Sequence, residues 1–309
     1  AHAHALIRDP SDMSLAIWSP SGVVAKAPVL RKAAKRLGQM GFQVSVDESA
    51  ARKHQRFAGT DAERLDALHR MCDVSPDIVL ATRGGYGVTR LLPQIDWSRL
   101  ASSVSRGTRW VGHSDLTALQ LGLLATEGAV TWHGPMACGD FGADEVDDIT
   151  APCFVEAMTG ELEAVGFRTE AGFDGLEGEG VLWGGNLSMI CSLLGTPWFP
   201  HIEGGVLFVE DVNEHPYRVE RCLLQLAQAG VLDRQAAVLL GEFSDWRKSP
   251  LDKGYGLKSM VQAVRAATRT PVLTGLPFGH VPTKVLLPVG AQVDLVSEGR
   301  DALLVWGHI

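Results

Sequence analysis

Two hydrophobic patterns alternate along the first half of the chain. Short apolar runs, or runs that alternate with polar residues, are typical of strands, and they lie at 14–18, 43–47, 77–82, 109–112 and 129–133. Apolar residues at helical spacing fill the intervals at 29–40, 62–71 and 115–125. This order predicts a mostly parallel sheet flanked by helices on both faces, with ligands bound beyond the carboxyl ends of its strands.

The pattern changes after Gly134. Residues 139–148 are acidic and glycine-rich, which predicts a loop, and residues 151–159 fit a short helix. Apolar core runs then lie at 181–183, 206–212, 236–243 and 284–296. Helical spacing returns at 186–194, 217–228 and 257–269. We therefore expect a second α/β domain.

These patterns predict the domain boundaries. We expect an N-terminal domain over 14–159, a linker over 160–179, which is rich in Glu and Gly, and a C-terminal domain over 180–309. Residues 1–13 are expected to be a disordered or tag-like terminus. They lack the basic region and apolar run of a signal peptide, and a frayed end explains His2 and His4 better than metal binding does.

Composition narrows the class of protein. The chain has 309 residues, of which 46% are hydrophobic and 21% charged, as in ordinary globular proteins. Its net charge of -8 argues against nucleic acid or an anionic membrane as a partner. No apolar stretch reaches the ~18 residues that span a membrane. Five cysteines without a CxxC pair favour a reducing, cytoplasmic compartment over a disulfide framework or zinc ribbon.

Ser114, in the segment GHSDLTAL, is a candidate nucleophile. A predicted strand enters the turn and an apolar helix leaves it, which is the layout of a nucleophile elbow. The turn would expose the hydroxyl and direct the backbone N–H of Asp115 at a developing oxyanion. Leu116 replaces the second glycine of GxSxG, and the segment alone fits a helix N-cap serine as well.

A serine nucleophile needs a base and an orienting carboxylate. His113 is a poor base because adjacent side chains diverge, whereas His280 follows an apolar run in the loop segment GLPFGH. Glu210 and Asp211 end the apolar run VLFVED. Acidic residues at such a position usually face solvent, but one of these two could instead orient the histidine. The competing histidines are His54, His69, His133, His201 and His215.

Several other segments could contact a substrate. The glycine-rich stretch 84–87 matches no phosphate-loop or dinucleotide motif, but its backbone N–H groups could approach a substrate oxygen closely. Trp183 to Asn186 (WGGN) fits a tight turn with Asn186 as an N-cap better than a substrate contact. Arginines that could clamp a carboxylate, or simply form surface ion pairs, are Arg83, Arg90, Arg218 and Arg221. No HExxH or His/Asp cluster supports a metal.

Taken together, six segments resemble the LD-carboxypeptidase family of serine peptidases (family S66), and within it the cytosolic murein tetrapeptide enzymes of Gram-negative bacteria. The resemblance extends from about residue 14 to the end. The segments are RFAGTDAERL (56–65), ATRGGYGVTRLLPQIDW (81–97), GHSDLTALQLGLL (112–124), WGGNLSMICSLLGTPW (183–198), EDVNEHPYRVERCLLQL (210–226) and GLPFGH (275–280).

The resemblance implies a Ser–His–Glu triad of Ser114, His280 and Glu210, with the backbone N–H groups of Gly85 and Asp115 as an oxyanion hole. It places Ser114 in an N-terminal α/β domain and the other two triad residues in a C-terminal α/β domain with a mixed, partly barrel-like sheet. The site would then lie between the domains. Further substrate contacts are expected from Arg83, Trp183, Asn186 and Arg218.

The reaction implied is release of terminal D-alanine from a tetrapeptide containing meso-diaminopimelate, during peptidoglycan recycling in the cytoplasm. The resemblance implies no cofactor, a small muropeptide as the partner and a homodimer. Two alternatives remain. One is an immunity-type hydrolase of peptidyl- or aminoacyl-nucleotide antibiotics with the same triad, and the other is a non-catalytic protein that binds a small ligand.

Overall fold

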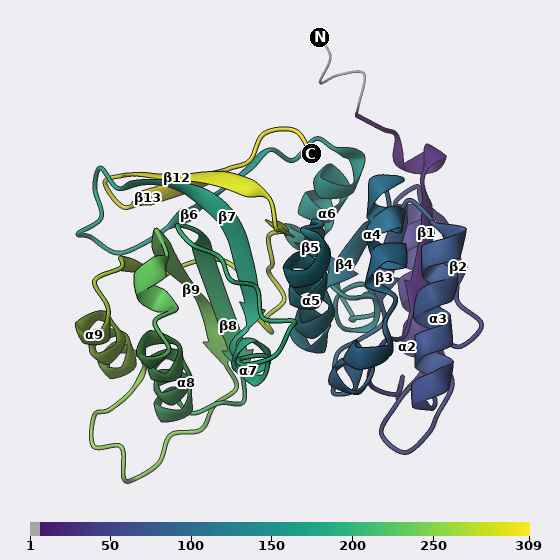
Figure 1. The fold of residues 1–309 in the computed structure, drawn as a ribbon. Coiled ribbons are helices and arrows are strands. Elements are labelled where there is room, and N and C mark those ends of the chain that lie inside the picture. Colours follow the sequence, from purple (N-terminus) through teal and green to yellow (C-terminus); the bar gives the residue numbers. More distant parts are fainter. Residues whose placement is uncertain (1–6) are drawn as a thin grey trace.

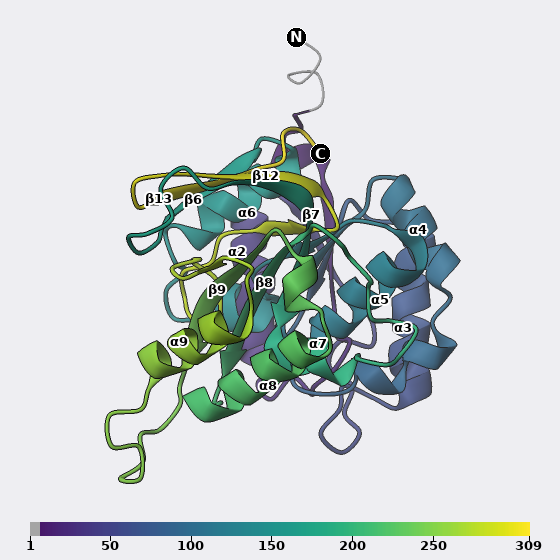
Figure 2. The same cartoon turned by 60° about the vertical axis from the view of Figure 1, so that its left-hand side comes forward.

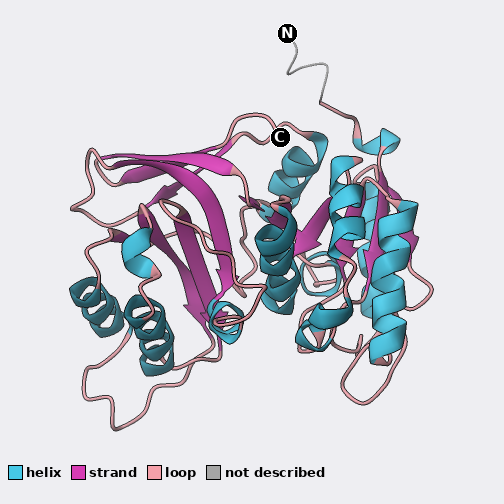
Figure 3. Cartoon of the chain, in the orientation of Figure 1, coloured by secondary structure: helices cyan, strands magenta, loops and turns pink. Residues whose placement is uncertain are grey.

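The computed structural model describes residues 7–309 and contains two sheets that lie side by side with helices packed on them (Figures 1 and 3). The first half of the chain forms one sheet and most of the second half forms the other, as the α/β pattern predicted. No helix in the described part of the chain is long and apolar enough to cross a membrane.

The N-terminal sheet has six strands in the order β11-β5-β4-β3-β1-β2. Its strands are β1 (Ser14–Trp18), β2 (Gln43–Val46), β3 (Ile78–Ala81), β4 (Arg109–Gly112), β5 (Thr131–His133) and β11 (Leu287–Val289). All neighbours pair in parallel except β11, which is antiparallel to β5. The buried runs of β1 and β3 are continuous because helices cover both faces of the sheet.

Helices connect these strands. They are α2 (Ala27–Gln39), α3 (Asp61–Val74), α4 (Trp97–Ser105), α5 (Thr117–Glu127) and α6 (Thr150–Thr159). Short 3₁₀ turns are η1 (Pro10–Asp12), η2 (Val88–Arg90), η3 (Leu92–Gln94) and η4 (Ser114–Leu116), and η5 (Ala137–Phe141) is a π-helical turn. α3 begins with a capping box in which Thr60 and Glu63 satisfy each other's backbone N–H groups.

The C-terminal sheet has seven strands in the order β10-β9-β8-β7-β12-β13-β6. They are β6 (Ala164–Arg168), β7 (Glu177–Asn186), β8 (Val206–Val212), β9 (Ala237–Ser244), β10 (Val272–Leu273), β12 (Gln292–Glu298) and β13 (Asp301–Val305). Its helical segments are α7 (Leu187–Ser192), α8 (Pro216–Gln228), the 3₁₀ turn η6 (Leu232–Arg234) and α9 (Leu257–Ala267). Pairing is parallel from β10 to β7 and antiparallel from there to β6, so the sheet is mixed. It ends at two separate edge strands and forms no closed barrel.

Three segments differ from the sequence expectation. The stretch 160–179, predicted as a linker, contains β6, which pairs with β13 inside the C-terminal sheet. Of the terminus predicted to be disordered, residues 1–6 lie outside the described part. The described remainder packs on the domain, because Arg8 bonds to Asp77 at 2.6 Å and η1 follows. The apolar run 284–296 breaks at Gly290 into β11 and β12, which join different sheets.

Helix α5 lies between the two sheets (Figures 1 and 2). Every residue from 117 to 124 is buried, which is typical of a helix with a hydrophobic neighbour on each side. One continuous hydrophobic cluster includes residues of both sheets and of α5. The carboxyl ends of β4 and β8 therefore face each other across a packed junction, where a site between the two halves can form.

Candidate active site at the junction of the two sheets

Ser114 lies at the turn between β4 and the helical segment that continues into α5. Its φ angle is 62°, in the left-handed region that a residue with a Cβ atom ordinarily avoids. Strained backbone of this kind clusters at functional sites, where the surrounding structure holds it in place. The geometry agrees with the elbow that the sequence predicted.

Glycine-rich backbone packs directly against this serine. A Cβ atom placed on Gly84 would lie 2.7 Å from Ser114 Oγ, so only glycine leaves the hydroxyl its space. Gly85 follows with φ 96°, which glycine adopts freely. The N–H of Asp115 belongs to the first turn of η4, where backbone N–H groups lack an intrahelical acceptor. Both N–H groups proposed for an oxyanion hole thus lie on the loops around Ser114.

The side chain of Asp115 fastens these loops together. Its Oδ2 accepts a hydrogen bond from Ser21 Oγ at 2.6 Å and another from the backbone N–H of Val88 at 2.9 Å. The carboxyl group is buried, and burial raises its pKa while the hydrogen bond from Ser21 opposes the rise. One side chain therefore connects the loops that follow β1, β3 and β4.

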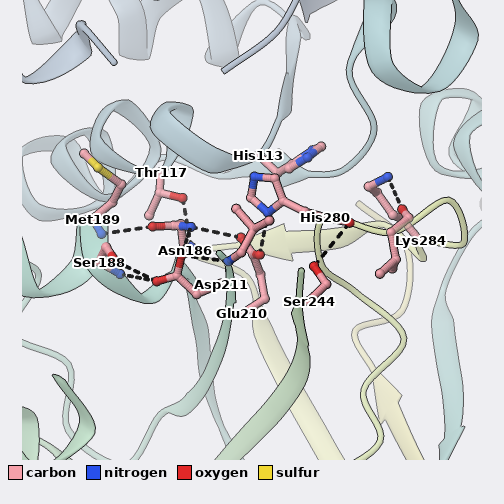
Figure 4. A network of polar contacts seen from close by, with 12 residues as sticks. His113, Thr117, Asn186, Ser188, Met189, Glu210, Asp211, Ser244, His280 and Lys284 are labelled. Carbon is pink, nitrogen blue, oxygen red and sulfur yellow. Dashed lines mark hydrogen bonds and ion pairs between the residues drawn. The ribbon is translucent and has the colours of Figure 1, made fainter. Parts of the chain in front are cut away.

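His280 and Glu210 form a pair on the C-terminal side of the junction (Figure 4). His280 Nδ1 lies 2.8 Å from Glu210 Oε2. Burial raises the pKa of Glu210, against the effect of the histidine. Burial lowers the pKa of His280, but the hydrogen bond and charge of Glu210 outweigh it, so this pKa is raised above 6.5. The contact leaves Nε2 of His280 for a second partner.

The two halves meet at the histidine rings. The centroid of His280 lies 5.0 Å from that of His113, which directly precedes Ser114, and the rings are nearly perpendicular. No hydrogen bond joins Ser114 to His280 among residues 7–309. Such bonds often tighten only when substrate binds. His113 itself is buried with Nδ1 2.8 Å from the carbonyl of Gly134, and burial holds its pKa well below 6.5.

Asn186 and Asp211 support the carboxylate side of the site (Figure 4). The Asn186 side chain accepts a hydrogen bond from the backbone N–H of Met189, so it is the N-cap of α7, as the sequence favoured. Its amide nitrogen donates to Asp211 at 3.1 Å and lies 3.5 Å from Glu210 Oε1. Asp211 also accepts from the backbone and side chain of Ser188. Of the two adjacent carboxylates, Glu210 contacts the histidine and Asp211 holds the helix start.

The remaining predicted contacts lie in different places. The Arg83 guanidinium donates to the carbonyl of Val23 and packs on Gly22 and Gly85, close to the expected oxyanion hole. Trp183 is fully buried and donates to Gln235, so this indole has no surface for a substrate, contrary to that expectation. Arg218 is half-exposed and pairs with Glu214 at 2.7 Å.

The competing histidines occupy other environments. His133 is buried, and burial lowers its pKa to about 3. His215 lies 2.9 Å from Asp252, and His69 accepts from the backbone N–H of Asp96. His54 and His201 are exposed. In the described part of the chain, no cluster of three or more His, Cys, Asp or Glu residues is arranged to hold a metal ion.

A pocket of about 370 Å³ adjoins His280 and His113. Lys284 and Asp140 line it and form an ion pair of 2.5 Å. The sequence analysis singled out neither residue. Lys284 could have been noticed because it follows His280 by four positions in the same loop, but nothing in the sequence connects it to Asp140.

Comparisons with known proteins show the family to which the chain belongs. Residues 15–134 match the profile of the LD-carboxypeptidase N-terminal domain, and residues 179–295 match that of the LD-carboxypeptidase C-terminal domain. The murein tetrapeptide carboxypeptidase of Pseudomonas aeruginosa is 32% identical over 96% of this chain and 94% of its own length.

Solved structures resemble the whole fold. The crystal structure of muramoyltetrapeptide carboxypeptidase from Oxalobacter formigenes superposes with a TM-score of 0.86 at 42% identity, covering 94% of this chain and 99% of that one. A structure of MccF with glutamyl sulfamoyl guanosine superposes with a TM-score of 0.84 at 22% identity, covering 97% and 98%, and therefore shows a shared fold. The microcin C7 self-immunity protein MccF of Escherichia coli is 26% identical over 92% of this chain and 89% of its own length.

Proposed function

Because this chain belongs to the LD-carboxypeptidase family of serine peptidases, family S66, and is a carboxypeptidase of that kind, we propose that it is a muramoyltetrapeptide LD-carboxypeptidase. It hydrolyses the amide bond between the L-centre of meso-diaminopimelate and a terminal D-alanine. The names of the relatives from Pseudomonas aeruginosa and Oxalobacter formigenes support a murein tetrapeptide as the substrate.

One observation carries the proposal. The histidine–carboxylate pair from the C-terminal half contacts, ring to ring at 5.0 Å, the residue that precedes Ser114 in the N-terminal half. A serine on a strained turn, an imidazole and a buried carboxylate are the groups that acyl transfer needs. A protein that only binds a ligand would not need a serine on a strained turn close to an imidazole held by a buried carboxylate.

The attack begins with proton transfer. Nε2 of neutral His280 takes the proton of Ser114 Oγ as the oxygen adds to the substrate carbonyl. Glu210 holds Nδ1–H and stabilises the imidazolium that forms. The carbonyl oxygen becomes an oxyanion and receives hydrogen bonds from the backbone N–H groups of Asp115 and Gly85. Losing one such donor typically costs about 3 kcal/mol of transition-state stabilisation.

The second half of the reaction releases both products. The imidazolium of His280 gives its proton to the amide nitrogen, the C–N bond breaks, and D-alanine leaves with a free amine. The remaining peptide is then an ester of Ser114. His280 takes a proton from water, the hydroxide adds to the ester carbonyl, and Ser114 recovers its proton as the shortened peptide leaves.

The proposal is tested by following D-alanine release from a meso-diaminopimelate tetrapeptide by mass spectrometry. The wild type should release D-alanine, and Ser114→Ala should lower kcat by at least about 10⁴-fold. His201→Ala, which changes an exposed histidine outside the site, is the matched control and should keep full activity. Turnover of an aminoacyl sulfamoyl adenosine with no release from the tetrapeptide would replace this proposal with the immunity-type activity.

Location and assembly follow from the same proposal. We propose a cytoplasmic enzyme, a location supported by five cysteines that are all free thiols. The homodimer remains a prediction, and sedimentation of the purified protein tests it. Sedimentation as a monomer at micromolar concentration would contradict it.

A further inference from the structure

The pocket beside His280 is lined by both apolar and charged residues. Its volume of about 370 Å³ lies in the range of small-molecule sites. Met136, Val146 and Pro282 give it apolar walls. His280, the proposed base, borders it together with His113, which directly precedes Ser114, so the pocket adjoins the proposed site.

The polar part of the pocket contains both signs of charge. The Lys284 and Asp140 side chains are only 5% and 6% exposed and form an ion pair of 2.5 Å. Lys284 Nζ also donates to the carbonyl of Val281, and an ammonium group has three donors, so one remains for a ligand. Figure 4 shows Lys284 on the side of His280 away from Asn186, at some distance from the support of Glu210.

Glu145 adds a free carboxylate. It is an exposed residue that lines the same pocket, and it forms no ion pair in the part of the chain that the structure describes. Asp147 also lines the pocket, but its carboxylate already accepts hydrogen bonds from Thr150 and Thr283. An ammonium group near Glu145 and Asp140, with a carboxylate on Lys284, would give the other charged groups of the pocket partners of opposite sign. A buried ion pair contributes little net stability, so its position beside the site points to a role in binding.

We propose that this pocket binds the far end of the residue that contributes the scissile carbonyl, when that end carries an ammonium and a carboxylate on one carbon. The D-centre of meso-diaminopimelate is such a group, so the inference rests on the proposed function and assigns its substrate specificity to Lys284, Asp140 and Glu145. The leaving D-alanine fits less well, because within the peptide it offers a carboxylate and no ammonium, and Glu145 would repel it.

Three tetrapeptides that differ only at the third residue test this assignment. They carry meso-diaminopimelate, L-lysine, which lacks the carboxylate, or norleucine, which lacks both charged groups. The quantity measured is kcat/KM for D-alanine release. We expect meso-diaminopimelate to exceed norleucine by at least about tenfold, because a site with buried polar groups rejects a ligand that leaves them unpaired, and lysine should lie between.

A variant connects this selectivity to the pocket. Glu145→Gln should reduce the ratio of kcat/KM for meso-diaminopimelate over norleucine by about three- to tenfold, the effect of losing one partly exposed ion pair with the substrate. The matched control is Asp148→Asn, which removes an exposed carboxylate three residues away that does not line the pocket. It should leave the ratio unchanged.

The outcomes separate this inference from the proposed function. Equal turnover of all three peptides, or the same change in ratio for both variants, would overturn the pocket assignment and leave the carboxypeptidase activity standing. An equal effect of Glu145→Gln on all three peptides would mean that the pocket holds a part common to them, which also overturns it. Release of D-alanine from none of them would overturn both proposals.

Discussion

At the scale of one residue, the backbone conformation that positions the Ser114 hydroxyl lowers the stability of the fold. Its left-handed φ of 62° costs about 1–2 kcal/mol for a residue with a Cβ atom. The loops that Asp115 fastens together hold it there. This backbone strain should disappear when Ser114 is replaced by glycine, because glycine adopts a positive φ without a steric penalty.

The first prediction concerns this strain. Ser114→Gly should be more stable than Ser114→Ala by about 1 kcal/mol, because glycine adopts positive φ without penalty, while the larger freedom of its unfolded chain offsets part of the gain. Both variants should be inactive. Urea unfolding of the two proteins measures the difference, and a Ser114→Ala protein as stable as Ser114→Gly would show that the turn is unstrained.

The second prediction concerns pH. Only neutral His280 can accept the Ser114 proton, so kcat/KM should rise with pH along a limb whose pKa is above 6.5, raised by Glu210. In Glu210→Gln the opposing effect of burial remains, so this limb should move to lower pH while kcat falls about 10²- to 10⁴-fold. The pH profiles of kcat/KM for both proteins test this. An unchanged pKa of the limb in Glu210→Gln would mean that Glu210 does not influence the titration of His280.

Individual residues differ in how far the sequence predicts them. Ser114, Glu210 and His280 each stand at the end of a strand-like run or in a loop beside one, and the family motifs select them among several histidines and acids. The pair of Lys284 and Asp140 joins positions 144 residues apart. No local pattern specifies such a contact, because it depends on how the two halves pack.

At the scale of elements, the site depends on loops that follow parallel strands. The turn after β3 lies against the turn after β4, and this close approach is possible because Gly84 has no side chain. Periodicity predicted most strands and helices well, since β1, α2 and β8 bury the faces that their sequences mark as apolar. It missed α4, β6, β10, β13 and the division between β11 and β12. The pairing of β6 and β11 is set by distant residues, which local periodicity does not register.

The third prediction belongs to these loops. Gly84→Ala places a methyl group 2.7 Å from the Ser114 hydroxyl, so it should displace the nucleophile and lower kcat by at least about 10²-fold while the protein remains folded. Gly38→Ala is the control. Its methyl group meets nothing within 4 Å in α2, and it should leave kcat unchanged and stabilise the fold by about 1 kcal/mol. Full activity of Gly84→Ala would mean that the loop moves to accommodate the methyl group without displacing Ser114.

At the scale of the molecule, the two halves are joined by more than a linker. The loop that carries His280 continues through Lys284 into β11, which completes the N-terminal sheet beside β5. Thr283 donates to Asp147 and Thr150 donates to the carbonyl of Pro282, both across the junction. The base is thus held in place by the half of the molecule that contains the nucleophile.

The fourth prediction tests this connection. Lys284→Met leaves Asp140 buried without its partner, so the free energy of unfolding should fall by about 3–5 kcal/mol. The double variant Lys284→Met with Asp140→Leu should recover part of this loss, because two apolar side chains leave no unpaired charge. Denaturant unfolding measures both proteins. An unchanged free energy of unfolding in the single variant would show that water or another polar group replaces Lys284 as the partner of the Asp140 carboxylate.

The central claim is that Ser114 and His280, from opposite halves of the chain, act as one unit, and a mutant cycle on D-alanine release tests it most directly. If they do, Ser114→Ala, His280→Ala and the double variant should all lose about the same factor in kcat, because residues that act together are not additive. Losses in the single variants that multiply in the double variant, or a Ser114→Ala protein that keeps its wild-type rate, would contradict the account.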